Sequence, residues 1–97
     1  MKYTSKFKSK ENDELFRAIL ALESNEECYR FFEDIMTIKE LKEISQRWEV
    51  AGMLNAGKTY NEIAAKTNAS AATISRVNKC LVYGADGYKS ILARLEK

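Results

Sequence analysis

A chain of 97 residues, 45% of them hydrophobic and 31% charged, has the composition of one small soluble domain, and a core of this size gains stability by oligomerising. The absence of proline and the presence of only four glycines favour helices over a turn-rich sheet. Histidine, an apolar run of membrane-spanning length and a signal peptide are all missing, so we expect a cytoplasmic protein that is neither an enzyme nor a metal protein and needs no cofactor.

The charges are unevenly distributed, although the net charge is only +2. Residues 1–10 carry four lysines and no acidic residue, whereas residues 11–36 carry eight acidic residues and two arginines, a net charge of −6. Residues 37–97 carry ten basic and six acidic residues, a net charge of +4. This pattern favours a polyanion on the last two-thirds of the chain, with solvated helix faces as the alternative. Cys28 and Cys80 lack metal-ligand spacing, and we expect two buried thiols rather than a disulfide.

The first nine residues differ from the rest of the chain because they show no apolar periodicity. Residues 1–9 predict a flexible basic arm, which either contacts phosphates or is simply a disordered tail. Residues 10–97 are expected to form a single helical domain. Its first helix is predicted over residues 10–22, with Leu15, Ile19 and Leu22 along one stripe.

A second helix is predicted over residues 24–36. Ser24 and Glu27 have the spacing of a capping box, in which each side chain accepts a hydrogen bond from the other residue's backbone N–H. The helix has a wide apolar face, formed by Cys28, Phe31, Phe32, Ile35 and Met36. A core stripe is the ordinary explanation, but so large a face on so short a chain favours partial burial in a second subunit.

The longest helix, of about 18 residues, is predicted to start at a third capping box, Thr37 with Glu40, and to end before Gly57. Residues 10–57 are therefore the expected dimerisation helices. Near the other end of the chain, Asp86 is predicted to N-cap a last helix over residues 87–96. The side chains expected to face inward from that helix are Tyr88, Ile91, Leu92 and Leu95.

Residues 59–83 have the pattern of a helix-turn-helix. Thr59 and Glu62 form a capping box at the start of the first helix. Asn68 suits the left-handed backbone of a sharp turn, and Ser70 is a favourable N-cap for the second helix. The inward stripe of the second helix is predicted to comprise Ile74, Val77 and Leu81.

The outward face of the second helix contains only small, hydroxylated, amide or basic residues, which suit a helix that enters a DNA groove. We predict that base edges are contacted by Ala71, Ala72 and Ser75, with Asn61 reaching from the first helix. We predict that phosphates are contacted by Lys58, Tyr60, Thr73, Arg76, Asn78 and Lys79. The alternative is a helix pair that serves packing or contacts a protein.

The stretch from Thr37 to Tyr88, and within it LKEISQRWEVAGMLNAGKTYNEIAAKTNASAATISRVNKCLVYG, resembles the Trp repressor family. The similarity is greatest to the YerC/YecD-type branch of Trp repressor-like proteins. The resemblance implies an all-α, six-helix fold that forms an intertwined homodimer. It also implies a bacterial transcriptional regulator, a repressor, that binds a two-fold operator in double-stranded DNA.

The resemblance also suggests a candidate effector pocket. The family's namesake holds its corepressor, tryptophan, between two arginines, beside a glycine and a serine. Here Arg76 matches one arginine, the other falls on Gln46 with Arg47 adjacent, the glycine falls on Val77 and the serine on Cys80. Our hypothesis is that Val77 and its neighbours fill the pocket, so that no tryptophan is required. Two other readings are a protein-interaction module with only non-specific DNA affinity and a sensor of another small molecule.

Overall fold

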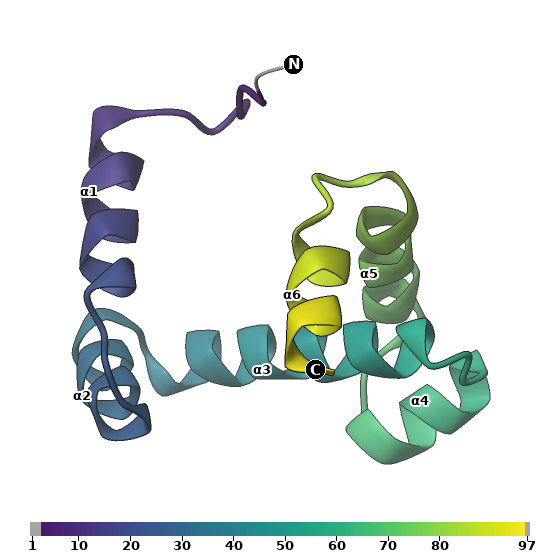
Figure 1. Ribbon diagram of the computed structural model, residues 1–97. Coiled ribbons are helices and arrows are strands. Elements are labelled where there is room, and N and C mark those ends of the chain that lie inside the picture. The colour runs from purple at the N-terminus through teal and green to yellow at the C-terminus, as the bar shows by residue number, and fades with distance from the viewer. Residues whose placement is uncertain (1–2, 97) are drawn as a thin grey trace. The chain divides into compact units, whose positions relative to one another are not determined.

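The computed structural model describes residues 3–96, and all regular secondary structure in that range is helical (Figure 1). The helices are α1 (Lys10–Leu20), α2 (Asn25–Ile35), α3 (Ile38–Asn55), α4 (Tyr60–Thr67), α5 (Ala71–Tyr83) and α6 (Gly87–Leu95). The predicted all-α class and order of six helices are confirmed. The chain divides into two compact units, residues 1–37 and residues 38–97. Residues 1 and 2 of the predicted arm lie outside the described range.

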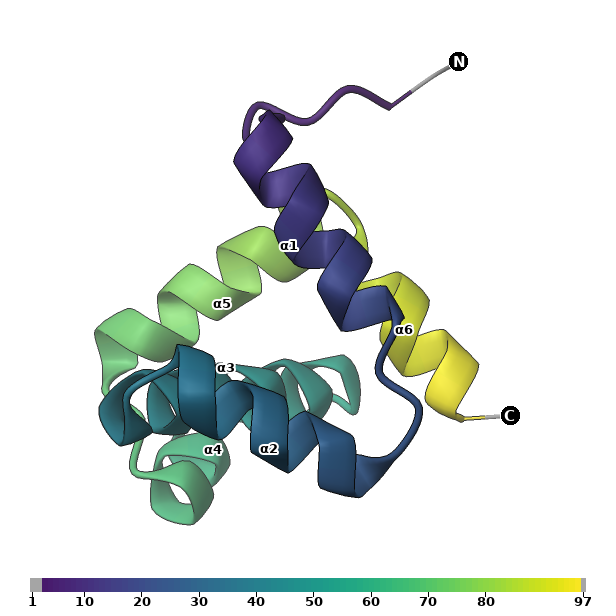
Figure 2. The same ribbon diagram turned by 90° about the vertical axis from the view of Figure 1, so that its left-hand side faces the viewer.

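Unit 1 contains α1 and α2 (Figure 2). Each of these helices begins at a serine N-cap. The Ser9 hydroxyl accepts a hydrogen bond from the Asn12 N–H at 3.0 Å, and the Ser24 hydroxyl accepts one from the Glu27 N–H at 3.1 Å. The Glu27 carboxylate accepts from the N–H of Glu23 rather than from that of Ser24. The predicted capping box is therefore only half formed, because Glu27 reaches one residue further back.

The predicted arm is joined to α1 by polar contacts among its described residues. Lys8 forms an ion pair with Asp13, and the Asn12 side-chain amide donates to the Phe7 carbonyl at 2.7 Å. Helix α1 ends at Leu20, two residues before the predicted end. The N–H groups of the next two residues bond carbonyls only three positions back, which tightens the last turn into a 3₁₀ geometry.

The apolar faces of α1 and α2 are only partly buried. Neither α1 nor α2 contains a buried residue. Phe31 and Phe32 pack edge to face, with ring centroids 5.3 Å apart, but both remain only half-buried. Leu20 is 85% exposed. Each helix has 11 residues, a length at which an isolated helix is only marginally stable in water.

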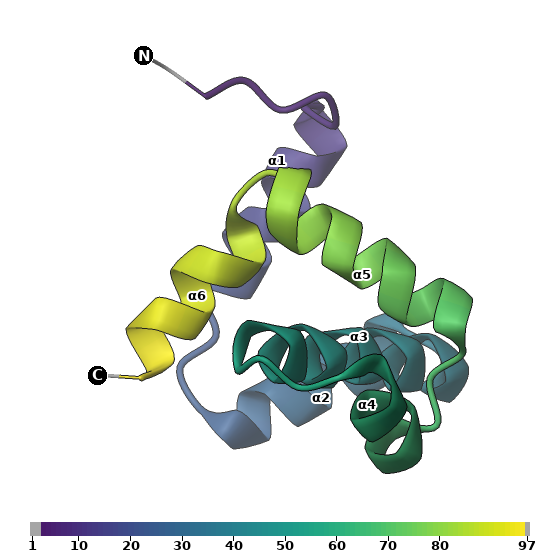
Figure 3. The same ribbon diagram turned by 90° about the vertical axis from the view of Figure 1, so that its right-hand side faces the viewer.

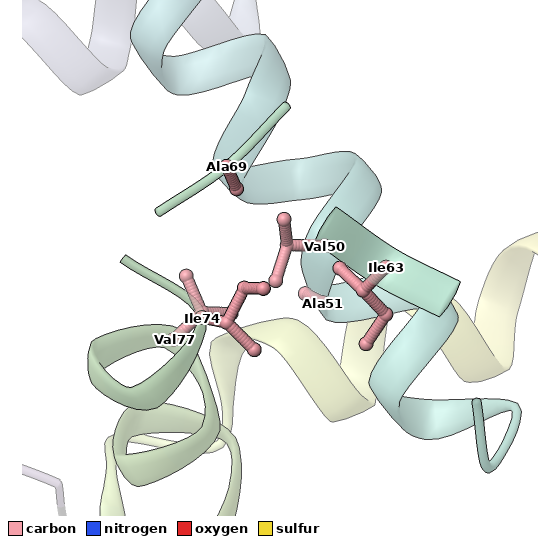
Figure 4. Close-up of a cluster of buried hydrophobic side chains, with 6 residues drawn as sticks. All are labelled: Val50, Ala51, Ile63, Ala69, Ile74 and Val77. Carbon is pink, nitrogen blue, oxygen red and sulfur yellow. The ribbon is translucent and has the colours of Figure 1, made fainter. Parts of the chain in front are cut away.

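Unit 2 contains α3 to α6, and its core forms where α4 and α5 pack against the carboxyl-terminal half of α3 (Figure 3). The residues that meet in this core are Val50 and Ala51 of α3, Ile63 of α4, Ala69 of the turn, and Ile74 and Val77 of α5 (Figure 4). Helix α6 contacts both α3 and α5, and Tyr88 places its ring 6.2 Å from that of Trp48. The predicted inward stripe of α5 is confirmed, because Ile74, Val77 and Leu81 are all buried.

Glycine ends two of these helices. After α3, Gly57 has a φ of 84°, and the Gly57 and Lys58 N–H groups bond the carbonyls of Leu54 and Met53 at 3.0 Å. This is the Schellman arrangement expected where the chain leaves a helix in the left-handed conformation. At Gly84, after α5, an added Cβ would lie only 2.2 Å from the Cys80 carbonyl oxygen, so a side chain has no room.

Three predictions for unit 2 are wrong within the single chain. Cys80 is exposed rather than buried, because it lies about 100° around α5 from the buried Leu81; Cys28 is half-buried. Ile91 and Leu95 of α6 do not face inward: only one side of α6 packs on the unit, and Leu95 is 69% exposed. Asp86 precedes α6 but makes no side-chain cap, since its backbone is left-handed, with a φ of 68°.

The position of the core predicts that two valines of α5 contribute very differently to the free energy of unfolding. Val77 is 2% exposed and Val82 is 52% exposed. Val77→Ala should lower the free energy of unfolding by about 2–3 kcal/mol, from lost burial and a residual cavity. Val82→Ala, the same change one and a half turns later, should cost less than about 0.5 kcal/mol. Urea denaturation at one fixed protein concentration compares them, and equal losses would contradict the assigned core.

Candidate nucleic-acid interface

Helix α4 begins in a complete capping box. The Thr59 hydroxyl accepts a hydrogen bond from the Glu62 N–H at 3.1 Å, and the Glu62 carboxylate accepts one from the Thr59 N–H at 2.9 Å. The bond from the Thr59 backbone, aided by the Thr59 side chain and the charge of Lys58, holds the pKa of the Glu62 carboxyl below its ordinary value of 4.5. The predicted start of the helix pair is confirmed.

The turn from α4 to α5 is made by three residues, and the predicted roles of two of them are confirmed. Asn68 is left-handed, with φ 62° and ψ 12°, and its N–H donates to the Ala64 carbonyl at 2.9 Å. Ser70 caps α5 by accepting a hydrogen bond from the Thr73 N–H at 3.1 Å. Between them Ala69 is buried in the core, so the turn is anchored by apolar packing as well as by hydrogen bonds.

The face of α5 that points away from the core is open to solvent. Ala71, Ala72, Ser75, Arg76 and Lys79 are exposed on it, and Asn78 is half-buried. This face borders an open groove of about 610 Å³, lined by Tyr60, Ala72, Ser75, Arg76, Asn78, Lys79, Val82 and Tyr83. None of the lining residues is acidic and two are cationic. The groove therefore suits an anionic partner.

Some predicted contact residues lie outside this lining. Lys58, Asn61 and Ala71 are exposed, at the start of α4 or of α5. Thr73 is half-buried, and its hydroxyl oxygen accepts a hydrogen bond from the Ser70 hydroxyl at 3.1 Å. The Thr73 hydroxyl can still donate its own hydrogen to a phosphate.

Sequence reasoning missed two residues that line the groove. Val82 and Tyr83 extend it toward the end of α5, and Tyr83 is 83% exposed. They follow Lys79 by three and four positions, the spacing that places side chains on one helix face. That spacing was the available signal, but an apolar residue and a tyrosine at the end of a helix also fit a core.

The residues of the candidate effector pocket lie in different surroundings. Val77 is buried in the core, whereas Arg76 and Cys80 are exposed on α5. Arg47 is half-buried on α3. Gln46, also half-buried, lines depressions along α3, and its side-chain nitrogen donates to the Thr67 carbonyl at 3.1 Å. The groove that Arg76 lines is on α4 and α5 instead.

Comparison with known proteins places this arrangement in a family. Residues 10–96 match the family described as Trp repressor protein. The chain belongs to the Trp repressor family. It is 52% identical over 92 residues to a Bacillus subtilis (strain 168) protein named "Uncharacterized protein YerC", covering 95% of this chain and 88% of that protein.

Two crystal structures of the same family type are closely similar. A TrpR-like protein from Eubacterium eligens ATCC 27750 has a TM-score of 0.91 and 53% identity, with 94% of each chain covered. A protein from Staphylococcus aureus has a TM-score of 0.90 and 48% identity, with 94% of this chain and 91% of that one covered. The predicted resemblance to the Trp repressor family and its YerC-type members is thus confirmed.

Membership of this family confirms that the chain is a non-enzymatic protein, as predicted. Within residues 3–96, no helix is long and apolar enough to cross a membrane. In the same range, no three side chains of the metal-ligating types Cys, Asp and Glu gather where they could hold an ion.

The capping box predicts how stability depends on pH. Because the Glu62 pKa is lowered by folding, the ionised carboxylate stabilises the fold above pH 4.5, and this contribution disappears as the pH falls through the folded-state pKa. Glu62→Gln should therefore be less stable than the wild type at pH 7, with the difference shrinking at lower pH. Thermal unfolding across this range measures it. A difference that is constant with pH would contradict the assigned cause.

Proposed function

We propose that this protein is a homodimeric, sequence-specific DNA-binding regulator of transcription that acts as a repressor. The observation that carries the proposal is the outer face of α5, which is exposed, free of acidic residues and set on a buried core. Membership of the Trp repressor family supports the same conclusion. The shape of the helix pair, a short capped helix, a left-handed turn and a second capped helix, is that of a helix-turn-helix.

In this proposal the amino-terminal half of α5 reads base edges. Ala71 and Ala72 are exposed and small, so the helix backbone can approach the floor of a major groove and contact thymine methyl groups. The Ser75 hydroxyl, one turn later, can donate to or accept from a base edge. Asn61 of α4 is exposed and adds an amide that can pair with adenine.

The remaining contact residues fix the helix pair on the DNA backbone. Arg76 and Lys79, which line the groove, supply charge to phosphates, and Lys58 adds charge at the start of α4. Hydrogen-bond donors toward phosphates come from Tyr60, Thr73 and Asn78. These contacts confer affinity and register but no sequence preference, which the base-edge contacts supply.

Dimerisation follows from the apolar surface that the single chain leaves uncovered. Large hydrophobic side chains are exposed on every one of α1, α2, α3 and α6: Phe16, Leu20, Tyr29, Ile35, Ile38, Ile44, Ile91 and Leu95. A second copy has the same helices with the same exposed hydrophobic side chains. An interlocked homodimer therefore buries these side chains on both subunits. Two-fold symmetry would place the two α5 helices about 34 Å apart, in successive major grooves.

A second candidate function is favoured by the exposed Val82 and Tyr83 at the end of the groove. Aromatic and apolar residues beside basic ones also suit a protein partner. In that case α5 would dock on a protein, and DNA binding would be only electrostatic. A preference for one DNA sequence over others at equal salt distinguishes the two functions, because an electrostatic interaction shows none.

The dimer should depend on Leu20. Its burial in an interface is worth about 1.5–3 kcal/mol, and a symmetric dimer contains it twice, so Leu20→Gln should raise the dimer dissociation constant at least about a hundredfold. Glu11→Gln is the matched control, because residue 11 lies about 180° around α1 from residue 20. Sedimentation equilibrium measures both variants, and a wild-type chain that stays monomeric would contradict the proposal.

Contact with phosphate should be visible in the salt dependence of DNA binding. Lys79→Ala should weaken binding to all duplexes alike and reduce the slope of log affinity against log salt by about one. Lys89→Ala removes the same charge from the exposed surface of α6 and should leave the slope unchanged. Fluorescence anisotropy over a salt series measures both. Equal slopes for wild type and Lys79→Ala would show that Lys79 contacts no phosphate.

The buried Val77 supports DNA binding without a tryptophan corepressor. Because its side chain is packed in the core, α5 is already held against α3 by protein atoms. Titration with tryptophan should change DNA affinity by less than about twofold. A tightening of about tenfold or more would show that the ligand still finds a site, and would contradict the hypothesis.

A further inference from the structure

The end of α4, just before the turn to α5, makes a polar contact with α3 that its local sequence does not explain. The Gln46 side-chain amide donates a hydrogen bond to the Thr67 carbonyl at 3.1 Å, across 21 residues of chain. A carbonyl oxygen only accepts hydrogen bonds, so the contacting atom of Gln46 is its amide nitrogen, which donates. Both residues are half-buried, so the bond is partly shielded from water.

Thr67 is the last residue of α4, where helical carbonyls lack partners within the helix. Its hydroxyl donates to the Ile63 carbonyl at 2.8 Å and accepts from the Ala69 N–H at 3.1 Å. Its own carbonyl accepts the bond from Gln46. Thr67 thus links α4, the turn and α3 through one residue.

A second contact joins the same two helices but contributes little. The Lys66 Nζ and the Glu49 Oε2 lie 3.4 Å apart, and the two side chains are 68% and 46% exposed. Exposed ion pairs of this kind are weakened by solvent and salt. The neutral, half-buried bond from Gln46 therefore links the end of α4 to α3 more firmly than this ion pair does.

We propose that Gln46 is a positioning residue for DNA recognition, which sets the start of α5 by tying the end of α4 to α3. The inference rests on the proposed function. The core holds α5 itself through Ile74 and Val77, which lie beyond its first turn, and it anchors the preceding turn at Ala69. The tie to Thr67 restrains the chain four residues before α5 begins at Ala71.

Loss of the bond from Gln46 should affect specific and non-specific DNA binding unequally. Hydrogen bonds and close contacts to base edges depend steeply on distance and angle, whereas charge on phosphates acts over a longer range. A looser turn should therefore weaken specific binding and leave non-specific binding and its salt slope almost unchanged. A residue needed only for stability would lower both together, by reducing the folded fraction.

The test compares Gln46→Met with the wild type. Methionine is unbranched and similar in length but has no N–H donor, and the change leaves the net charge intact. Ser45→Ala, at the exposed neighbouring position of α3, is the matched control. On a duplex site selected by the wild-type chain, Gln46→Met should lose about three- to tenfold in affinity. On a scrambled duplex it should change less than about twofold. Equal losses on both duplexes, or no loss on either, would overturn the proposal.

Hydrogen exchange tests the tie without DNA. The Asn68 and Ala69 N–H groups should exchange faster in Gln46→Met, and also in Gln46→Glu, which keeps the shape but replaces the donor by a carboxylate oxygen. Amides in the middle of α5 should be unchanged. Unchanged exchange at Asn68 and Ala69 would overturn the role of Gln46. If the wild type instead prefers no duplex sequence, the proposed function fails, and the exchange result still decides whether the tie exists.

Discussion

The packing of Val50 and Ala51 of α3 against α4 and α5 is the contact on which the rest of unit 2 depends. Both residues are fully buried, and through them one helix orders the two that follow it. Ile63 and Ile74 meet these residues from α4 and α5, so the inward stripe of each short helix is satisfied at the same point. Once these stripes are buried, the opposite face of α5 must point outward. The exposed, acid-free surface is therefore a consequence of the core.

Unit 1 stands in contrast, because its helices α1 and α2 are amphipathic but contain no buried residue. Apolar surface such as that of Leu20 is costly to leave in water, and α3 and α6 carry further exposed apolar residues. In our account the same chain supplies the missing cover from a second copy. DNA recognition and dimerisation are then connected through α3, whose carboxyl-terminal half holds the helix pair while its amino-terminal half has no buried residue.

Much of the fold could be predicted because its signals are local. The capping box of Thr59 with Glu62 and the left-handed Asn68 depend on residues within four positions of one another, and both are confirmed. The bond from Gln46 to Thr67 could not be predicted, since its partners are 21 residues apart and meet only through packing. The exposure of Cys80 was missed for a similar reason. Periodicity identifies an apolar stripe. Whether the residues beside that stripe are buried depends on how the helices pack against one another.

We propose that this chain, as a dimer, presents two α5 helices to one specific DNA sequence. Selection of binding sites from a random duplex pool at near-physiological salt tests it most directly. We expect enrichment of an inverted repeat whose half-sites are centred about 10 base pairs apart, one turn of the double helix. No enrichment by a protein shown to be folded and dimeric would contradict it, and would leave the helix pair as a docking surface for another protein.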